Sequence, residues 1–426
     1  MPDVGAAFRR PMSIAFACLM CTALAACGEP APGRHLSFSG SALGQEGALI
    51  RTQLDRFAAQ HPGVDVSIRI TPDAANQRHQ LYVQWLNAHV PEPDVLQLDI
   101  VWTAEFAAAG WIRPLAVDTA DFFPAAVQAN RWRGVLYAVP WFVDAGLLYW
   151  RTDLFAEAPS SIDALRAEAV YAQRERGVAN GLVWSGARYE GVVTVFVEYL
   201  TAFGGHVFSD DGAIVVDSPE AVRALTFMRD SLGEQGFVPV SALSWQEEQV
   251  RFAFQNGQSA FMRNWPYAWA LLQDPQRSRV ANRIGVAPMP PASGGRPSAA
   301  LGGAQLALNR YTREPELAAS LVEFLTAPAQ MLERARVASQ LPARRSLYDS
   351  PDLGRALPMP IADIRRALDA TVARPVTPVY SEMSEILQVH LHRALTSQEE
   401  PSTALHDAAR EIRALLDRSG LRGAAS

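Results

Sequence analysis

Between residues 35 and 100, short stretches with a strand pattern alternate with longer stretches that have a helix pattern. Apolar side chains recur at helical spacing within residues 46–60, and Pro62-Gly63 end this helix. Apolar and polar residues alternate over residues 64–70, which is typical of a strand. The predicted order is strand 35–39, helix 46–60, strand 64–70, helix 78–88 and strand 95–100. Such an order with short links favours a parallel sheet that carries helices on its faces.

The same alternation returns in the second half of the chain. Ser218-Pro219-Glu220 combines a capping residue, a proline and an acidic residue, and this predicts the start of a helix. A chain of 426 residues is also too long for one ordinary core. The sequence therefore predicts two α/β units of similar style. The further predicted elements are strands 147–150, 259–262 and 285–289 and helices 316–326, 381–395 and 402–419.

The N-terminus has the features of a secretion signal. A basic pair, Arg9-Arg10, precedes a short apolar run that ends in Leu24-Ala25-Ala26-Cys27. Small residues directly before a cysteine resemble the lipobox of bacterial lipoproteins, in which that cysteine is lipidated. We therefore predict a lipoprotein signal peptide over residues 1–27 with lipidation of Cys27, and a tether over residues 28–34. The alternative is an ordinary signal peptide that is cut at another small residue.

Composition and missing motifs argue against several classes of protein. All three cysteines lie within the first 27 residues, so the mature chain has no disulfide framework, no cysteine metal site and no thiol nucleophile. A net charge of −6 argues against nucleic-acid binding. The sequence contains no phosphate-binding loop, no H-E-x-x-H and no G-x-S-x-G. We predict a binding protein with no catalytic residue, no metal and no cofactor.

Four stretches combine aromatic residues with carboxylates or arginine, which is the chemistry that binds sugars. Aromatic rings cover the apolar faces of a sugar, and charged groups form the stronger hydrogen bonds to its hydroxyls. Asp99 follows a buried strand, at the end where open α/β sheets bind ligands, and a helix-capping role is its alternative. Asp144 stands in a largely apolar run, where a structural salt bridge is the alternative. The four stretches are 98–111, 139–149, 261–269 and 372–380.

The other two stretches also allow two interpretations each. Trp265, Tyr267 and Trp269 surround Pro266 and predict an aromatic platform where a loop enters a helix. Alternatively Trp265 and Trp269 are core residues four positions apart on one helix, and we expect at least one of them to be buried in the core. Arg374 in a proline-rich segment points into a cleft in one interpretation and lies on the surface in the other.

Taken together, these stretches resemble the extracellular solute-binding proteins of ABC sugar importers, and most of all the trehalose/maltose-binding branch. The similarity runs in the same order from about Leu36 to the last helix, so it covers nearly the whole mature chain. The segments on which this resemblance rests are residues 98–111, Tyr189-Glu190-Gly191, residues 196–199, residues 264–269 and Arg374-Pro375.

This resemblance implies a two-lobed periplasmic-binding-protein fold of type II. Each lobe would be a mostly parallel α/β sheet flanked by helices, and a hinge would close the lobes on a ligand. The implied first lobe is residues 35–143 and 304–339, and the second is residues 144–303 and 340–426. Tyr189 and Glu190 are weaker candidates for the site. The residues that the resemblance assigns to the ligand are Glu46, Arg78, Asp99, Asp144, Trp265, Tyr267, Gly303 and Arg374.

The expected function is capture of an α-linked glucose disaccharide, trehalose or maltose, by a monomer anchored outside the cytoplasmic membrane. The partners would be the permease subunits of an importer with a separate ATPase. Ala304 stands where close relatives carry an aromatic residue, so the identity of the sugar stays open. The alternatives are a receptor for another oligosaccharide or a polyol, a chemosensory or structural lipoprotein, and a lipid-anchored glycoside hydrolase. That hydrolase would use Asp99 and Asp144 as its carboxylate pair.

Overall fold

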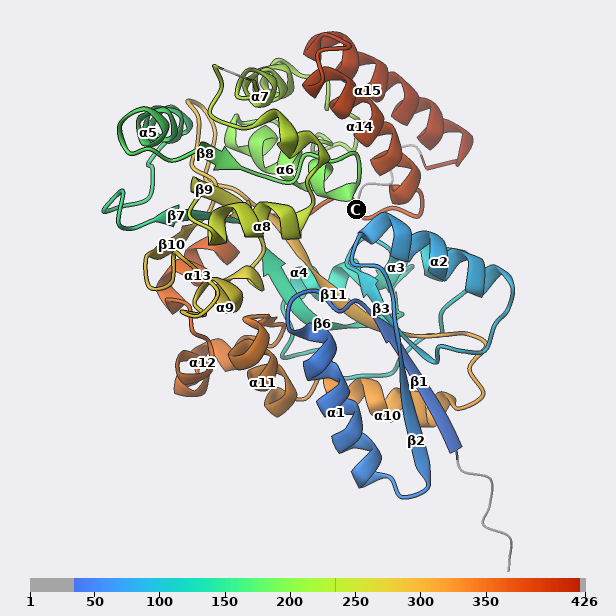
Figure 1. Ribbon diagram of the computed structural model, residues 1–426. Coiled ribbons are helices and arrows are strands. Elements are labelled where there is room, and N and C mark those ends of the chain that lie inside the picture. Colours follow the sequence, from blue (N-terminus) through green and yellow to red (C-terminus); the bar gives the residue numbers. More distant parts are fainter. Residues whose placement is uncertain (1–33, 234, 422–426) are drawn as a thin grey trace, which may run out of the picture. The chain divides into compact units, whose positions relative to one another are not determined.

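The computed structural model describes residues 34–233 and 235–421, and the chain from Arg34 onward forms one compact unit (Figure 1). The predicted signal peptide, the lipidation site Cys27 and most of the predicted tether lie outside the described residues. Arg34, which was assigned to the tether, is instead the first residue of strand β1, where it pairs with Val64.

The larger of the two main sheets is mixed, whereas mostly parallel sheets were expected. β1 pairs in parallel with β2 and β3, as the alternating pattern predicts. β11, however, is antiparallel to both β3 and β6 and lies between them. The strand order is β12-β6-β11-β3-β1-β2, with β13 paired to β11. Its strands are β1 (Arg34–Gly40), β2 (Val64–Ile70), β3 (Val95–Asp99), β6 (Ala138–Ala145), β11 (Ala299–Leu308), β12 (Leu341–Pro342) and β13 (Thr371–Val372).

The smaller sheet has four strands in the order β10-β7-β9-β8, and its pairs are antiparallel except for β8 with β9. The chain passes from the larger sheet to the smaller one at Gly146, which separates β6 from β7. The strands of the smaller sheet are β7 (Leu147–Arg151), β8 (Asn180–Val183), β9 (Ser259–Asn264) and β10 (Ile284–Ala287). β4 (Arg131–Trp132) and β5 (Val135–Leu136) form a separate hairpin.

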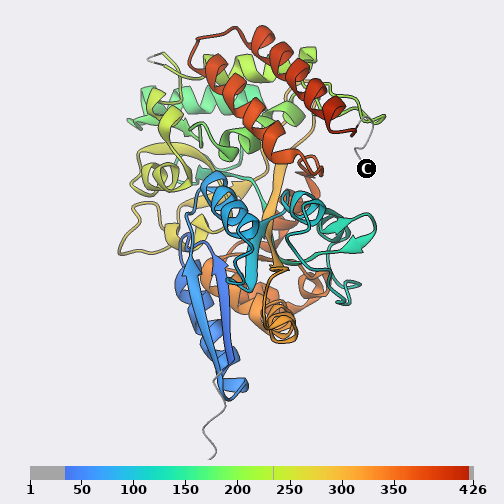
Figure 2. The ribbon, with the colours of Figure 1, turned by 90° about the vertical axis from the view of Figure 1, so that its right-hand side faces the viewer.

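Helices surround each sheet, so that the molecule has two lobes (Figures 1 and 2). Those around the larger sheet are α1 (Glu46–Gln60), α2 (Ala75–Asn87), α3 (Thr103–Ala108), α4 (Pro124–Ala129), α10 (Pro315–Leu325) and α11 (Pro328–Ala338). Those around the smaller sheet are α5 (Ile162–Glu175), α6 (Glu190–Ala202), α7 (Pro219–Asp230), α8 (Glu247–Gln255), α14 (Tyr380–Leu395) and α15 (Pro401–Arg418).

The remaining short helices connect these parts. α12 packs on α11, and α13 contacts strands of both main sheets. β12 pairs with β6, so the segment 340–426, which was assigned to the second lobe, begins with a strand of the larger sheet. These helices are α9 (Ala268–Leu272), α12 (Pro351–Ala356), α13 (Ile361–Asp369) and the 3₁₀ turns η1 (Val240–Ser244) and η2 (Arg345–Asp349).

Local sequence signals placed most element boundaries correctly. α1 and β2 have the predicted bounds, and Ser218 caps α7 by accepting a hydrogen bond from the Ala221 amide at 3.3 Å. α2 begins at Ala75, three residues earlier than predicted. Its N-cap residue Ala74 has no side chain that can accept a hydrogen bond, so the sequence carries no signal for this start.

Candidate functional site

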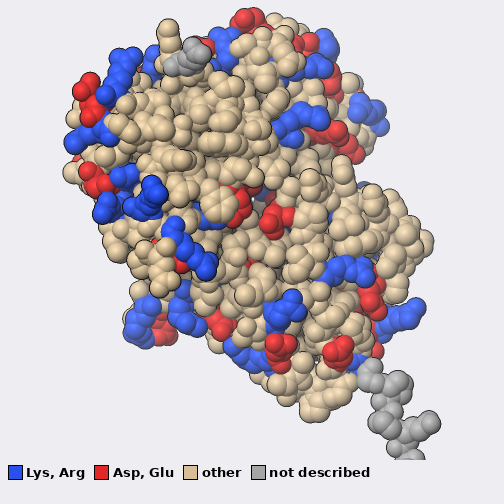
Figure 3. All heavy atoms as spheres, in the orientation of Figure 1, with Lys and Arg blue, Asp and Glu red and all other residues tan. Residues whose placement is uncertain are grey.

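A cavity lined by residues of both lobes contains all eight side chains or backbone positions that were assigned to a ligand. They are Glu46, Arg78, Asp99, Asp144, Trp265, Tyr267, Gly303 and Arg374. Tyr189, Glu190 and Ala304 line the same cavity. Figure 3 shows acidic side chains gathered where the surface is hollowed between the two lobes. Segments that lie far apart in the sequence therefore converge on one place.

Strand pairing in the larger sheet brings the polar groups of the cavity close together. Asp99 is the last residue of β3 and lies opposite Ala304 of β11. Asp144 of β6 lies opposite Gly302 of β11. Because β11 runs between β3 and β6, the two aspartates flank the same short segment of this strand. Asp99 thus occupies the carboxyl end of a strand, as was predicted.

Gly303 has a structural reason to be glycine. Its φ angle is +118°, a conformation that other residues rarely adopt. A Cβ atom at this position would lie 2.3 Å from the carbonyl oxygen of Phe142 on the neighbouring strand. Gly303 therefore presents only backbone to the cavity.

Glu46 is held by a network of buried hydrogen bonds beneath the cavity. Its Oε2 accepts from the Ser41 hydroxyl at 2.6 Å. Its Oε1 accepts from Arg334 Nη2 at 3.0 Å, Gln97 Nε2 at 3.2 Å and Gln340 Nε2 at 3.3 Å. A carboxylate oxygen has two lone pairs, so Oε1 is saturated and Oε2 can accept one further hydrogen bond.

Asp144 has a very different environment. Its Oδ1 atom is buried and has no hydrogen-bond partner among the described residues. Burial raises the pKa of Asp144 well above its ordinary value, and the negative charges of Glu46 and Asp99 raise it further. The alternative interpretation of Asp144 as half of a structural salt bridge is wrong, because no Arg or His of the described residues lies within ion-pair distance of it. This carboxyl group is therefore free to interact with a ligand.

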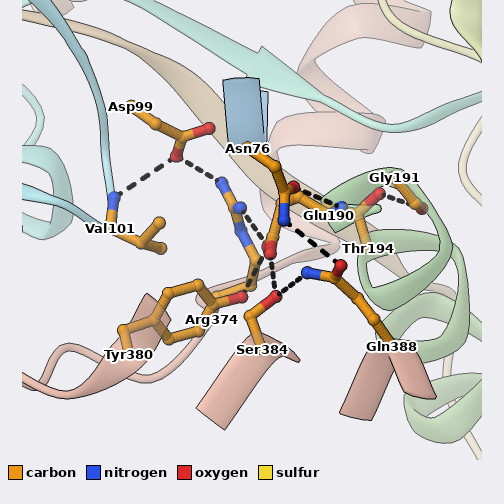
Figure 4. Close-up of polar contacts among 10 residues, drawn as sticks. All are labelled: Asn76, Asp99, Val101, Glu190, Gly191, Thr194, Arg374, Tyr380, Ser384 and Gln388. Atoms are coloured by element: carbon orange, nitrogen blue, oxygen red, sulfur yellow. Dashed lines mark hydrogen bonds and ion pairs between the residues drawn. The ribbon is translucent and has the colours of Figure 1, made fainter. Parts of the chain in front are cut away.

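Arg374 joins the two lobes at the edge of the cavity (Figure 4). Its Nη2 donates to Asp99 Oδ1 at 2.8 Å, and its Nη1 donates to Glu190 Oε1 at 2.6 Å. Glu190 also accepts hydrogen bonds from the Tyr380 hydroxyl at 2.6 Å and from the Ser384 hydroxyl. Arg374 is 4% exposed, so the alternative interpretation of a surface arginine is wrong.

The three aromatic residues of the predicted platform lie in different surroundings. Trp265 lies in the loop between β9 and α9, and the Arg263 guanidinium is 4.0 Å from its ring centre. Tyr267 donates a hydrogen bond from its hydroxyl to Glu248 at 2.8 Å. Trp269 does not line the cavity and belongs to the hydrophobic core, as was expected of at least one tryptophan here. Arg263 is in turn paired with Glu198 at 2.5 Å, and both side chains are 1% exposed.

Five buried polar atoms of residues that line the cavity have no hydrogen-bond partner among the described residues. Asp144 Oδ1 and Gln340 Oε1 are acceptors, Arg78 Nε and Arg374 Nε are donors, and the Tyr189 hydroxyl can both donate and accept. Buried polar atoms are usually paired, since leaving one unpaired costs about 1–3 kcal/mol. The cavity therefore offers a ligand both donors and acceptors.

Several residues of the cavity were missed by the sequence analysis. Gln97 lies two positions before Asp99 on the same strand and hence on the same face, so the strand pattern could have revealed it. Gln340 carries no such signal, because only the folded chain brings it to Glu46. The full set of missed polar residues is Ser41, Asp73, Gln97, Thr194, Glu247 and Gln340.

No group of three or more His, Cys, Asp and Glu side chains between residues 34 and 421, residue 234 aside, is arranged to hold a metal ion. In the same part of the chain, no helix combines the length and the apolar character that crossing a membrane requires.

Comparison with known proteins assigns the family. The model of the bacterial extracellular solute-binding proteins matches residues 41–332. A probable ABC transporter-binding protein of Deinococcus radiodurans is 34% identical over 386 residues, which cover 87% of this chain and 91% of that protein. Maltose-bound MalE3 of Thermotoga maritima has a TM-score of 0.85 and 38% identity, with 90% of this chain and 100% of that chain covered.

A solute-binding protein of Thermotoga lettingae bound to α-D-tagatose shares the fold, with a TM-score of 0.81, 22% identity and coverage of 90% of this chain and 100% of that chain. The match to the family model extends over most of the chain and includes the loop after β1, the end of β3, β6 and β11, which together build the cavity. The chain belongs to the bacterial extracellular solute-binding proteins.

Proposed function

We propose that this protein is the sugar receptor of an ABC importer and captures an α-linked glucose disaccharide, trehalose or maltose, between its lobes. The observation that carries the proposal is the set of unpaired buried donors and acceptors around the cavity. A sugar hydroxyl both donates and accepts hydrogen bonds, so a neutral polyhydroxyl ligand satisfies both kinds of atom. An ionic ligand of one sign would satisfy only one kind.

Aromatic surface next to these atoms supports the same ligand class. Trp265 is partly exposed beside Gly302, whose missing side chain leaves room for the indole ring. Such a ring can cover the apolar face of a pyranose. Tyr267 lines the same cavity as a second aromatic residue, whereas Ala304 offers no ring where close relatives would carry a further one.

The similarity to a maltose-bound protein at 38% identity supports an α-glucose disaccharide over other sugars. In this proposal the first lobe consists of residues 35–143 and 304–339. The second consists of residues 144–303 and of 340–426, apart from residues 144–145 and 299–303, β12 and β13, which lie in strands of the larger sheet. The lobes close on the sugar by a hinge, and the closed complex docks as a monomer on permease subunits that work with a separate ATPase. Lipidation of Cys27 would keep the receptor at the outer face of the cytoplasmic membrane.

Isothermal titration calorimetry tests this proposal. The chain from residue 27 onward, with Cys27→Ser to prevent lipidation, is titrated with trehalose, maltose, sucrose, maltotriose and glucose. We expect one-to-one binding of trehalose or maltose that is at least tenfold tighter than binding of glucose. A tenfold difference corresponds to about 1.4 kcal/mol of binding free energy, which the contacts of the second sugar ring should supply. Absence of binding by both disaccharides would refute the assigned sugar, and preferential binding of a polyol would replace it.

A further inference from the structure

A second cavity lies beside the proposed sugar cavity, between α2 and α14. Its volume is about 750 Å³, compared with about 120 Å³ for the sugar cavity. Trp102 and Trp111 contribute aromatic surface to it, and Gln77, Gln80 and Gln246 contribute amide groups. The second cavity is also lined by His79, Arg188 and the carboxylates of Glu105, Glu382 and Glu385. Aromatic rings together with amide and charged hydrogen-bonding groups suit further sugar units. The second cavity therefore has the size and the chemistry to continue the first.

A thin partition separates the two cavities. Three residues line both of them, namely Ala75 at the start of α2 and Tyr189 and Glu190 at the start of α6. Tyr189 and Glu190 are buried, with exposures of 5% and 7%. A sugar chain that left the first cavity in this direction would have to pass between the start of α2 and the start of α6.

Asn76 closes this passage by binding across it (Figure 4). Its Oδ1 accepts a hydrogen bond from the Glu190 backbone amide at 2.9 Å. Its Nδ2 donates to Gln388 Oε1 on α14 at 3.2 Å. The oxygen and the nitrogen of the Asn76 amide thus link the first lobe to helices α6 and α14 of the second lobe. Asn76 lines the second cavity and does not line the first.

The partition is also braced from the second lobe. Glu190, whose amide Asn76 binds, is fixed through its carboxylate by Arg374, Tyr380 and Ser384. Gln388 Nε2 donates to Ser384 Oγ at 2.8 Å, so both groups that Asn76 contacts belong to one hydrogen-bonded cluster. A braced contact of this kind resists displacement better than two isolated side chains would.

We propose that the bridge from Asn76 to Glu190 and Gln388 sets the length of sugar that the receptor accepts. It ends the site after a disaccharide, and without it the two cavities join into one that admits longer chains. This inference rests on the proposed function, since it concerns the same site and the same class of ligand. Asn76 acts here as a specificity-determining residue that need not touch the disaccharide.

A chain-length series of sugars tests the bridge. The wild-type protein and Asn76→Ala, both with Cys27→Ser, are titrated with trehalose, maltose, maltotriose and maltotetraose. We expect the wild type to bind a disaccharide at least tenfold more tightly than maltotetraose. In Asn76→Ala the affinity for maltotetraose should rise by tenfold or more. Its disaccharide affinity should fall by no more than about tenfold, which corresponds to the loss of two neutral hydrogen bonds.

The matched control is Asn87→Ala, which removes an exposed side-chain amide at the end of α2 that lines neither cavity. Its relative affinities for the four sugars should equal those of the wild type. Gln388→Ala removes the other half of the bridge and replaces Asn76→Ala if thermal melting shows that the latter is poorly folded. Asn76→Ala and Gln388→Ala should show the same increase in affinity for maltotetraose.

Two results would overturn the inference while the proposed function stands. The first is that the wild-type protein binds maltotetraose as tightly as its disaccharide. The second is that a well-folded bridge variant has the same relative affinities for the four sugars as the wild type. Failure of the wild type to bind any of these sugars would instead refute the proposed function, and this inference with it.

Discussion

Glu46 and Asp144 are acidic residues of the same cavity with opposite surroundings. Glu46 accepts four hydrogen bonds and forms an ion pair with Arg334, in which both side chains are at most 4% exposed. Asp144 accepts none from the described residues, and its pKa is raised well above the ordinary value. The difference separates two roles, because a carboxylate that accepts several hydrogen bonds from the fold also holds the scaffold together, whereas one that the fold leaves unsatisfied is available to a ligand alone.

The first prediction concerns the scaffold and has the largest expected effect. Burial lowers the pKa of Arg334 to about 10, so this side chain still carries its charge at neutral pH and balances that of Glu46. Arg334→Met removes the charge and leaves Glu46 buried without its partner. We expect the free energy of unfolding to fall by about 3–5 kcal/mol, as for other broken buried pairs. Urea denaturation followed by tryptophan fluorescence measures this change.

The same substitution at Arg336 provides the control. Arg336 lies on the same helix α11 but is exposed, so Arg336→Met should change the free energy of unfolding by less than about 0.5 kcal/mol. Similar losses of unfolding free energy in both variants would show that the buried Glu46 does not depend on Arg334. The contrast between a satisfied Glu46 and an unsatisfied Asp144 would then not hold.

The second prediction concerns Asp144 and ligand binding. Asp144→Asn keeps the shape of the side chain but removes the charged acceptor. The affinity for the disaccharide should fall by about 10- to 100-fold, which corresponds to about 1.5–3 kcal/mol for hydrogen bonds to a charged group. The free energy of unfolding at neutral pH should not fall, because the described part of the fold forms no hydrogen bond to this carboxyl group that the substitution could remove. Titration calorimetry and urea denaturation of one preparation measure both quantities.

An exposed aspartate gives the matched comparison for this variant. Asp65 of β2 has a side chain that is 81% exposed, and Asp65→Asn should leave both affinity and stability unchanged within about 0.5 kcal/mol. If Asp144→Asn lost stability and kept its affinity, Asp144 would be a structural residue and its assignment to the ligand would be wrong.

The contrast between these residues also explains how far the sequence could predict the site. Asp144 was found because a lone carboxylate in an apolar run is unusual. The network of Glu46 was not found, since Gln340 and Arg334 come from a distant segment and glutamine and arginine are common on surfaces. Residue type alone indicates which groups are chemically suited to a ligand, but it does not show which of them the fold has already satisfied.

The fold shows the same limit. The boundaries of α1 and β2 followed from local periodicity, which neighbouring residues determine. The pairing of β6 with β11 joins residues 138–145 to residues 301–307, and no local pattern specifies such a distant partner. This pairing makes the sheet mixed, and it also places Asp144 opposite Gly302. The contacts that sequence reasoning missed are therefore the ones that assemble the cavity.

The third prediction is the contribution of Asp144 to the pH dependence of stability and binding, and it is the smallest effect. Because its native pKa is raised above the ordinary value of 3.8, the native state keeps the proton over the interval in which the unfolded chain has released it. The free energy of unfolding should therefore fall as the pH rises from about 4 through the raised pKa, by at most about 1.4 kcal/mol per pH unit. Sugar hydroxyls donate to the ionised form, so the affinity should rise over the same interval and binding should release a proton.

Calorimetry in two buffers with different ionisation enthalpies measures the released proton. The charges that act on Asp144 are those of Glu46, Asp99, Arg263 and Arg334. Burial also raises the pKa of Asp73 in the same cavity, so the difference between wild type and Asp144→Asn isolates the contribution of Asp144. Equal proton release by the two proteins would show that Asp144 is already ionised without sugar. Its lack of a partner in the fold would then reflect a destabilising charge that binding does not relieve.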